Sequence, residues 1–409
     1  MRIVILNQYY APDEAATAQI AADLGAHLAK AGHEVTAICC DRSYAKPQRR
    51  YPRSEMIDGV HVKRVQTTAF GRSSRLGRVT DYLGFVAGAA VRLLRDKAPD
   101  VVVVLTTPPM VAYLPLRLRR FRGFRVVFWC MDVYPDVAFQ LGAIRRSSFA
   151  GRLLTRIGRS VLQSSDAVVA LGETMAGHLR TLGAKRVDVV NNWTDESTIV
   201  PVTAFDRPSR VEWNWTRRFV ILYSGNLGLA HEFETVVAAA KRLADVMPNV
   251  LFAFIGVGPR LNEVREATRE VPNVEFQDYV DRSRLGDTLS AGDVHLVTLR
   301  PDMAGLLVPS KIYGILAAGR PTIYIGPAEG EIDSIVREGR CGMSIRNADV
   351  DGLVRAIRDY ACDPKRSDDE GRNARQFFEA RFTKGKSLAA MQHIVEMAQS
   401  QEASQHRGH

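Results

Sequence analysis

VPSKIYGILAAGRPTIYIG, residues 308–326, is the stretch that decides how the second half of this chain folds. Pro309 suits the first turn of a helix, where its missing N–H is not needed, and Ser310 offers a capping hydroxyl. Gly319 fits the left-handed residue that ends a helix, and Pro321 then prevents the helix from resuming. The pattern predicts a turn followed by a short helix.

The same stretch continues into a strand. Thr322–Ile325 is a β-branched and aromatic run of the kind that fills a parallel sheet. Lys311 sits in the predicted first helical turn, where backbone N–H groups point outward and an anion is favoured. The stretch therefore indicates a phosphate site at the edge of an α/β sheet.

Strand and helix patterns alternate on both sides of it. Arg2–Leu6, Ala15–Ala31 and Glu34–Ile38 read as strand, helix and strand, which is a βαβ unit and requires a parallel sheet. The pattern restarts with a strand at Phe219–Tyr223 and a glycine turn at Ser224–Gly228. Residues 195–217 lose the periodicity and read as a linker. We therefore expect two Rossmann-like α/β domains with parallel sheets that face a central cleft.

Composition narrows the partners. The chain has 409 residues, a net charge of +10 and a pI near 9.5, which favour anionic partners, although the charge could simply serve solubility. The five cysteines form no CxxC pair, which is typical of reduced, mostly buried thiols in a cytosolic protein. No apolar run approaches the ~20 residues needed to span a bilayer, and the chain starts directly with a strand, so we expect no signal peptide.

A basic and apolar cluster, LPLRLRRFRGFR, follows at residues 114–125. Arginines set among Leu and Phe suit a surface that lies against anionic headgroups. A helix packed on the sheet with a solvated basic face explains the pattern equally well. Both interpretations stay open.

Short motifs in a fixed order indicate a resemblance to a known family. YSGNLG (223–228), FIGVGP (254–259), AGDVHLV (291–297) and EGEIDSIVREGRCGMSI (329–345) surround the opening stretch, and MDVYPD (131–136) lies in the first half. Together they resemble the retaining glycosyltransferases of family four, which have the GT-B fold. Within that family they are most similar to bacterial amino-sugar or fucosamine transferases of O-antigen, capsule and colanic-acid-type polysaccharide assembly.

The resemblance implies a domain plan. An acceptor-side domain would cover residues 1–200, and a nucleotide-sugar-binding domain would cover residues 201–384. A final helix at about 385–400 would pack back on the first domain, and a disordered tail would begin at residue 401. The enzyme would need no cofactor or metal: its donor is a UDP-sugar, and its acceptor is a polyprenyl-diphosphate-linked saccharide on the inner face of the plasma membrane. We expect a cytoplasmic, peripheral protein that does not bind nucleic acid.

This chain departs from the family pattern at positions that would bind the diphosphate in other members. The acidic pair that many members carry in this region reads Leu306 and Gly314 here, and the usual arginine and lysine of the glycine turn read Asn226 and His231. The diphosphate must then be met by backbone N–H groups of the turn, by the helix that begins near Pro309, and by Lys311. An ordinary surface lysine is the plain alternative for Lys311.

The expected site follows from these motifs. Lys311, Asp132 and His231 are the catalytic candidates, with Asp132 orienting the acceptor or the donor sugar. The donor would contact Gly225, Asn226, Leu227, Gly228, Gly256, Gly258, Tyr279, Val280, Ser310 and Glu331. For the glycines, purely structural turns are the alternative, and for Glu331 an ordinary helix start. Asp349 and Asp351 match the DxD pattern of metal-dependent transferases, but a carboxylate before a helix is a normal cap.

Two other functions compete with sugar transfer. A GT-B-fold UDP-N-acetylglucosamine epimerase would share the architecture but usually needs several carboxylates and histidines in its first domain. This chain is poor in histidine there, with His27, His33 and His61 before the cluster at residues 114–125. A basic nucleic-acid- or membrane-binding protein is the non-enzyme alternative. The sequence contains no recognised nucleic-acid-binding motif.

Overall fold

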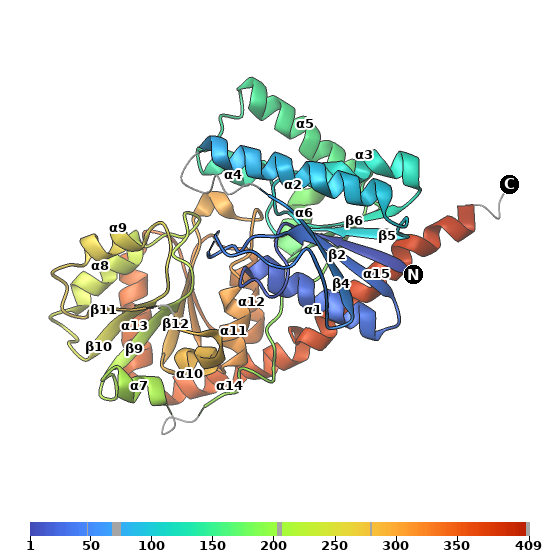
Figure 1. The fold of residues 1–409 in the computed structure, drawn as a ribbon. Helices are drawn as coiled ribbons and strands as arrows, with labels where there is room; N and C mark the ends of the chain where they lie inside the picture. Colours follow the sequence, from blue (N-terminus) through green and yellow to red (C-terminus); the bar gives the residue numbers. More distant parts are fainter. Residues whose placement is uncertain (47, 68–74, 203–206, 279, 406–409) are drawn as a thin grey trace. The chain divides into compact units, whose positions relative to one another are not determined.

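The computed structural model describes residues 1–46, 48–67, 75–202, 207–278 and 280–405. Two compact units divide the chain. The first contains residues 1–190 together with the segment from residue 388, and the second contains residues 191–387. Residues 191–200, which the sequence places with the first domain, belong to the second unit. Each unit has an α/β fold with one predominantly parallel sheet (Figure 1).

The first unit is built on an eight-stranded sheet in the order β3-β4-β2-β1-β5-β6-β7-β8, as far as the described residues go. Only the β3–β4 pair is antiparallel. The strands are β1 (Arg2–Leu6), β2 (Glu34–Cys40), β3 (Ser54–Ile57), β4 (Val60–Val65), β5 (Val101–Val104), β6 (Arg125–Trp129), β7 (Ala167–Ala170) and β8 (Val187–Val189). The hairpin β3–β4 was not predicted from the sequence, which reads there as a polar, basic segment.

Helices cover this sheet. They are α1 (Ala16–Lys30), α2 (Arg75–Arg95), α3 (Tyr113–Arg122), α4 (Asp136–Gln140), α5 (Phe149–Ser164) and α6 (Glu173–Thr181), with the last part of α15 (Lys384–Gln405). Phe85 of α2, Leu116 of α3 and Val161 of α5 share one buried cluster with Val4 and Val102 of the sheet. Helices α2, α3 and α5 therefore pack on the same face (Figure 1).

The second unit has a fully parallel six-stranded sheet in the order β11-β10-β9-β12-β13-β14. Its strands are β9 (Phe219–Ser224), β10 (Val250–Ile255), β11 (Val274–Gln277), β12 (Val294–Thr298), β13 (Thr322–Ile325) and β14 (Gly342–Ile345). The strand order reverses between β9 and β12. In open α/β sheets, ligands bind at the carboxyl ends of the strands at such a reversal.

The helices of the second unit follow the predicted alternation. They are α7 (Pro208–Glu212), α8 (Glu234–Leu243), α9 (Leu261–Ala267), α10 (Leu285–Ser290), α11 (Lys311–Ala317), α12 (Glu331–Gly339), α13 (Val350–Cys362), α14 (Pro364–Arg381) and the start of α15. The opening stretch folds as expected into α11 and β13, and Gly319 has the predicted left-handed φ of +64°. Ser310 precedes α11 but makes no side-chain cap hydrogen bond, so the predicted capping role is wrong.

The last part of the chain forms two helices. Helix α14 ends at Arg381, and α15 begins at Lys384, close to the final helix expected at about 385–400. Pro364 opens α14, with the carboxylate of Asp363 accepting from the N–H of Arg366 at 3.1 Å. Helix α15 continues to Gln405, so residues 401–405 are helical where a disordered tail was expected, and residues 406–409 lie outside the described part.

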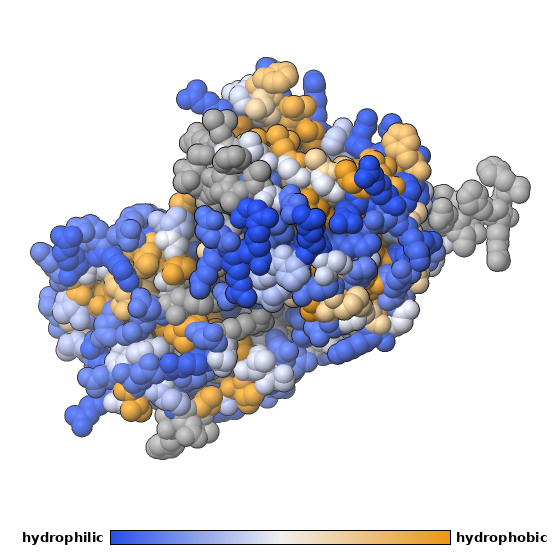
Figure 2. Space-filling view, in the orientation of Figure 1, coloured by the Kyte–Doolittle hydropathy of each residue, from blue (hydrophilic) through white to orange (hydrophobic). Residues whose placement is uncertain are grey.

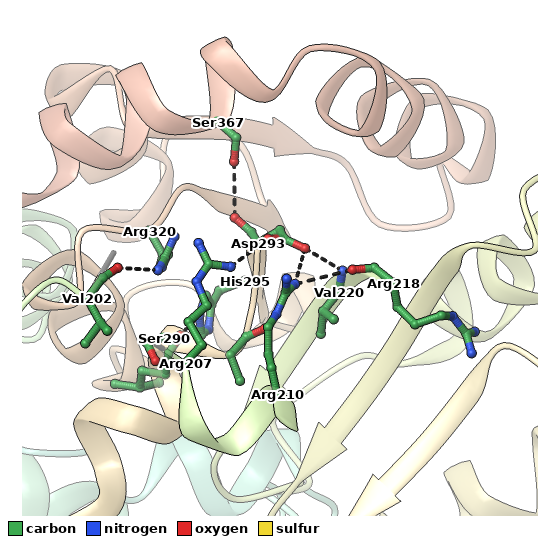
Figure 3. A network of polar contacts seen from close by, with 12 residues as sticks. Val202, Arg207, Arg210, Arg218, Val220, Ser290, Asp293, His295, Arg320 and Ser367 are labelled. Carbon is green, nitrogen blue, oxygen red and sulfur yellow. Dashed lines mark hydrogen bonds and ion pairs between the residues drawn. The ribbon is translucent and has the colours of Figure 1, made fainter. Parts of the chain in front are cut away.

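The predicted linker at 195–217 is fastened to the second sheet. Asp293, just before β12, accepts hydrogen bonds from Arg207 at 2.9 Å and from the N–H of Val220 at 2.8 Å, and it also pairs with Arg210 (Figure 3). Ser367 donates to the Asp293 carbonyl at 3.2 Å. One carboxylate thus joins this segment to the amino ends of β9 and β12.

Candidate active site

Two glycine turns meet backbone to backbone at the carboxyl edge of the second sheet. The turn after β9 donates from the N–H of Gly225 to the carbonyl of Ile255, at 2.9 Å, and from the N–H of Leu227 to the carbonyl of Val257, at 2.8 Å. A Cβ on Gly256 would lie 2.1 Å from the carbonyl oxygen of Gly225. The approach leaves no room for a side chain at Gly256, so this glycine is required by the fold itself.

The remaining turn positions divide between core and surface. Gly258 has φ of +154°, and a Cβ there would lie 2.4 Å from the Leu227 carbonyl. The Leu227 side chain is fully buried in the core of the second unit, so only its backbone faces the turn. Asn226 is exposed. The structure thus brings together six of the predicted donor-contacting residues: Gly225, Asn226, Leu227, Gly228, Gly256 and Gly258.

Lys311 reaches this turn from the first residue of α11. Its Nζ lies 3.4 Å from the centroid of the Tyr223 ring, and a Cβ built on Gly225 would lie 3.7 Å from Nζ. The residue as a whole is partly exposed, but Nζ itself is buried and has no hydrogen-bond partner among the described residues. Burial lowers the pKa of Lys311 well below its ordinary value. An ordinary surface lysine does not have this environment.

Tyr223 was not among the residues predicted for the site. It lies in β9, is fully buried, and donates from its hydroxyl to the carbonyl of Asn226 at 2.9 Å. A tyrosine in a buried strand looks like a core residue in the sequence. Nothing in the sequence alone connects it to Lys311, because the contact depends on how α11 packs beside β9.

His231 occupies the position where the resemblance implies a lysine. Its Nδ1 lies 2.6 Å from the carbonyl oxygen of Thr298, and its ring packs edge-on against Tyr223 at 6.0 Å between centroids. Burial, together with the nearby charge of Lys311, lowers the pKa of His231 to about 3. The imidazole is therefore neutral at physiological pH and adds no charge to the turn.

The other predicted residues of this unit lie in different surroundings. Glu331 begins α12, and Asn191 donates from its side-chain amide to it at 3.4 Å. Ser310 is exposed beside α11. Val280 packs against an apolar cluster that includes Trp215 and Leu222. Tyr279 lies outside the described residues.

The two positions of the missing acidic pair are apolar. Leu306 is buried, and a Cβ on Gly314 would lie 3.3 Å from a methyl group of Leu289. Asp349, from the DxD pattern, caps α13 by accepting from the N–H of Gly352 at 2.8 Å. Asp351 pairs with Arg242 at the surface. The described residues contain no group of three or more His, Cys, Asp or Glu side chains placed to hold a metal ion.

Asp132 belongs to the first unit and is described with it. It follows β6, and burial raises the pKa of its carboxyl group to about 6. The same burial, with the nearby Asp132 charge, raises the pKa of Tyr134 above its ordinary value. Asp136 begins α4 and pairs with Arg146 at 3.3 Å and His178 at 3.6 Å. Asp132 is thus a carboxyl group at this sheet edge whose pKa is displaced toward neutral pH.

Two α/β units, the second with a glycine turn that meets a buried lysine at a strand-order reversal, are consistent with the GT-B fold. Family models agree. "Glycosyl transferase 4-like domain" matches residues 16–193, and "Glycosyl transferases group 1" matches residues 218–363. The chain belongs to the family-four glycosyltransferases. That membership decides against the epimerase and the non-enzyme alternatives.

Curated relatives are bacterial glycosyltransferases. The chain is 30% identical over 274 residues to the probable glycosyltransferase WbjE of Pseudomonas aeruginosa, covering 66% of this chain and 68% of WbjE. It is 25% identical over 384 residues to the putative colanic acid biosynthesis glycosyl transferase WcaI of Escherichia coli, covering 89% of this chain and 93% of WcaI.

Solved structures share the fold. Sucrose-phosphate synthase from Thermosynechococcus elongatus superposes with a TM-score of 0.79 at 18% identity, over 97% of this chain and 98% of that one. HepE from Anabaena, solved in complex with UDP-glucose, superposes with a TM-score of 0.71 at 15% identity, over 97% of this chain and 100% of that one.

Within the described part of the chain, no helix is long and apolar enough to cross a bilayer.

Proposed function

We propose that this glycosyltransferase moves a sugar, in particular an N-acetylated amino sugar, from a UDP-sugar to a polyprenyl-diphosphate-linked saccharide, with retention of anomeric configuration. The donor class is supported by the likeness to HepE, which binds UDP-glucose. The pathway is supported by the likeness to WcaI, whose name refers to colanic acid biosynthesis. The product would be a building block of a bacterial surface polysaccharide.

One observation carries the proposal: the buried ammonium of Lys311 lies against the glycine turn and has no hydrogen-bond partner among the described residues. Departure of a nucleoside diphosphate leaves negative charge on phosphate oxygens, and a preorganised cation stabilises that charge most strongly in a water-poor site. The backbone of Gly225–Gly228 would approach the same phosphates closely, as glycines permit.

The other candidates receive supporting roles. Neutral His231 would contact the diphosphate without adding charge, since its pKa is about 3. Asp132 would orient a sugar hydroxyl, and Glu331 with Ser310 would contact the ribose or sugar. Gly256, Gly258, Tyr279 and Val280 would enclose the nucleotide. Because Lys311 and the turn supply the charge stabilisation, the reaction would proceed without a metal ion.

An anionic membrane surface is the second proposed partner. Large apolar side chains stand exposed among hydrophilic ones over α2, α3 and α5 in the first unit (Figure 2). These helices carry several arginines. Phe121 and Phe149 are each 78% exposed, and Leu83 is 64% exposed. Exposed apolar residues on a basic surface suit the boundary between headgroups and acyl chains. A lipid-linked acceptor would be reached from the cytoplasmic face.

Calorimetric titration with UDP, GDP and ADP, each with and without EDTA, tests the proposal. We expect UDP to bind best, EDTA to have no effect, and the variant Lys311→Met to lose most of the affinity. The variant Lys365→Met removes an exposed lysine of the same unit and is the matched control. Failure of all three nucleotides to bind the wild-type protein would overturn the site, and full affinity of Lys311→Met would remove Lys311 from it.

A further inference from the structure

Tyr223 makes two contacts that meet at the candidate phosphate site. The face of its ring lies under the Lys311 ammonium, with 3.4 Å between Nζ and the ring centroid. Its hydroxyl donates to the carbonyl of Asn226, within the glycine turn, at 2.9 Å. One fully buried side chain therefore touches both the cation and the turn that the proposed function assigns to the donor diphosphate.

The ring is itself held firmly. Phe233 packs against it edge-on with 5.0 Å between centroids, and Phe254 lies at 6.0 Å in a tilted arrangement. Strand β10 pairs directly with β9, and Phe254 lies opposite Tyr223 in this pairing. Such packing leaves the ring no alternative rotamer without disturbing the core of the second unit. The position of the ring face is thus fixed before any ligand arrives.

A ring face is an unusual place for a buried ammonium. Burying a charge without a partner is strongly unfavourable, and proteins normally supply a carboxylate. A carboxylate would neutralise the lysine and would have to be displaced before a phosphate could bind. An aromatic face attracts the cation more weakly than a carboxylate does. It can orient the ammonium and still leave its N–H donors available to an arriving anion.

The hydroxyl fixes the other half of the site. With its carbonyl accepting from Tyr223, Asn226 cannot rotate its peptide freely, and the N–H of Gly225 and of Leu227 are bonded to the β10 end of the sheet. The turn is therefore preorganised from both sides. The N–H groups of Gly225 and Leu227 are thereby used within the fold, and their bonds fix the shape of the turn. A turn fixed in this way needs little reorganisation when a phosphate binds.

We propose that Tyr223 is a positioning residue for the donor diphosphate: its ring face holds the Lys311 ammonium in place of a counter-ion, and its hydroxyl ties the glycine turn to the same point. This inference rests on the proposed function, since the diphosphate is its ligand. Tyr223 would then change the affinity for UDP through Lys311 and the glycine turn, not through contact with the nucleotide.

A double-mutant cycle on UDP affinity tests this dependence. We expect Lys311→Met to weaken UDP binding about 100-fold and Tyr223→Leu at least about tenfold. The double variant should bind no more than about fivefold more weakly than Lys311→Met alone, since the ring acts through the lysine and only the loss of the hydroxyl adds to it. Tyr223→Phe keeps the ring face and should lose no more than about fivefold, which corresponds to one neutral hydrogen bond. In that background, Lys311→Met should still show its full effect.

Phe254→Leu is the matched control, because it removes a ring from the same buried cluster without a contact to Lys311 in the described structure. It should keep UDP affinity within about twofold at a comparable loss of melting temperature. Equal losses in Phe254→Leu and Tyr223→Leu, or losses that multiply in the double variant, would overturn the inference while leaving the proposed function intact. If wild-type protein binds none of UDP, GDP and ADP, it is the proposed function that fails.

Discussion

The Nδ1 atom of His231 lies 2.6 Å from the carbonyl oxygen of Thr298, at the carboxyl end of β12. A carbonyl only accepts, so Nδ1 carries the proton and donates it, and Nε2 of the neutral ring is left as an acceptor. Where the resemblance implies a lysine, this chain has a neutral ring that contacts Tyr223 of β9 and Thr298 of β12. The cation at the turn comes from α11 instead.

We expect His231→Gln to retain activity within about tenfold, since it removes no charge. His231→Lys, which restores the common family residue, should lower activity further, by about 100-fold, because a second ammonium would repel Lys311 in a poorly solvated site. Steady-state rates and melting temperatures of both variants check this. Higher activity in His231→Lys than in His231→Gln would show that the turn accommodates a second cation.

Lys311 is expected to cost the free protein stability. Its pKa is depressed in the fold, so between the folded pKa and the ordinary value of 10.5 the unfolded chain binds more protons. Stability therefore rises with pH across that window and is lost as the pH falls through the folded pKa. Lys311→Met should raise the melting temperature by about 2–4 °C near neutral pH while lowering activity about 100–1,000-fold.

Thermal unfolding at several pH values measures this exchange of stability for function. The gain from Lys311→Met should grow as the pH is lowered, and Lys365→Met should show no gain at any pH. Saturating UDP should stabilise the wild type more than the variant. A variant that is less stable than the wild type at every pH would contradict the unpaired state of the ammonium.

Asp132 should set the acidic limb of the pH–rate profile. Its carboxyl pKa is raised to about 6, so activity that needs the carboxylate should fall about tenfold per pH unit below that value. Asp132→Asn should lower the rate and remove the limb, and Asp136→Asn should keep it. Stability should run the opposite way: between pH 3.8 and about 6 the folded chain holds a proton that the unfolded chain has lost, so stability falls as the pH rises.

Local signals made much of the fold predictable. The breaker pair Gly319 and Pro321, and the β-branched run Thr322–Ile325, depend only on neighbouring residues, and the structure has the helix end and the strand there. The hairpin β3–β4 was missed because β3 has no fully buried residue and β4 carries His61, Lys63 and Arg64 among its valines, so both strands look polar. Asp58 and Gly59, both with positive φ, form the two-residue turn that could have revealed it.

The site was predictable only where a motif names a residue. The glycine turns and Lys311 carry such signals, and the structure brings them together. Tyr223 opens the YSGNLG motif, but there it looks like the end of a buried strand, and its role depends on the contact with Lys311 of α11. Likewise, the basic segment Leu114–Arg125 gave two interpretations, and only contacts distinguish its arginines: Arg119 and Arg125 bind Asp166, at 3.1 Å and 3.0 Å.

Asp293 is expected to be the main attachment of residues 207–220 to the second sheet. Asp293→Asn removes the charge that holds Arg207 and Arg210 and should destabilise this unit by about 2 kcal/mol. Chemical denaturation followed by tryptophan fluorescence reports on it, since Trp213 and Trp215 lie in the same segment. The exposed pair Asp351–Arg242 provides the control: Asp351→Asn should change stability by less than about 0.5 kcal/mol. Equal effects would show that Asp293 is no stronger than a surface ion pair.

Membrane binding should depend on exposed aromatic residues and not on every arginine of α3. Arg119 holds Asp166, and Arg122 donates to the carbonyl of Asp96, so reversing these charges would damage the first unit whether or not it meets a membrane. Phe121 and Phe149 are each 78% exposed, which makes them better probes. Replacing each by Ser should weaken binding to phosphatidylglycerol vesicles about tenfold, as loss of ~1.4 kcal/mol of apolar contact predicts.

Cosedimentation with vesicles of increasing phosphatidylglycerol content measures the effect, with the melting temperature showing that each variant folds. Val211→Ser is the matched control, because Val211 is 71% exposed and lies in the second unit. Binding of the wild type should weaken with salt, since screening reduces attraction between arginines and headgroups. If the two Phe variants bind as the wild type does, the basic surface of α2, α3 and α5 serves solubility, and the lipid-linked acceptor must be reached without it.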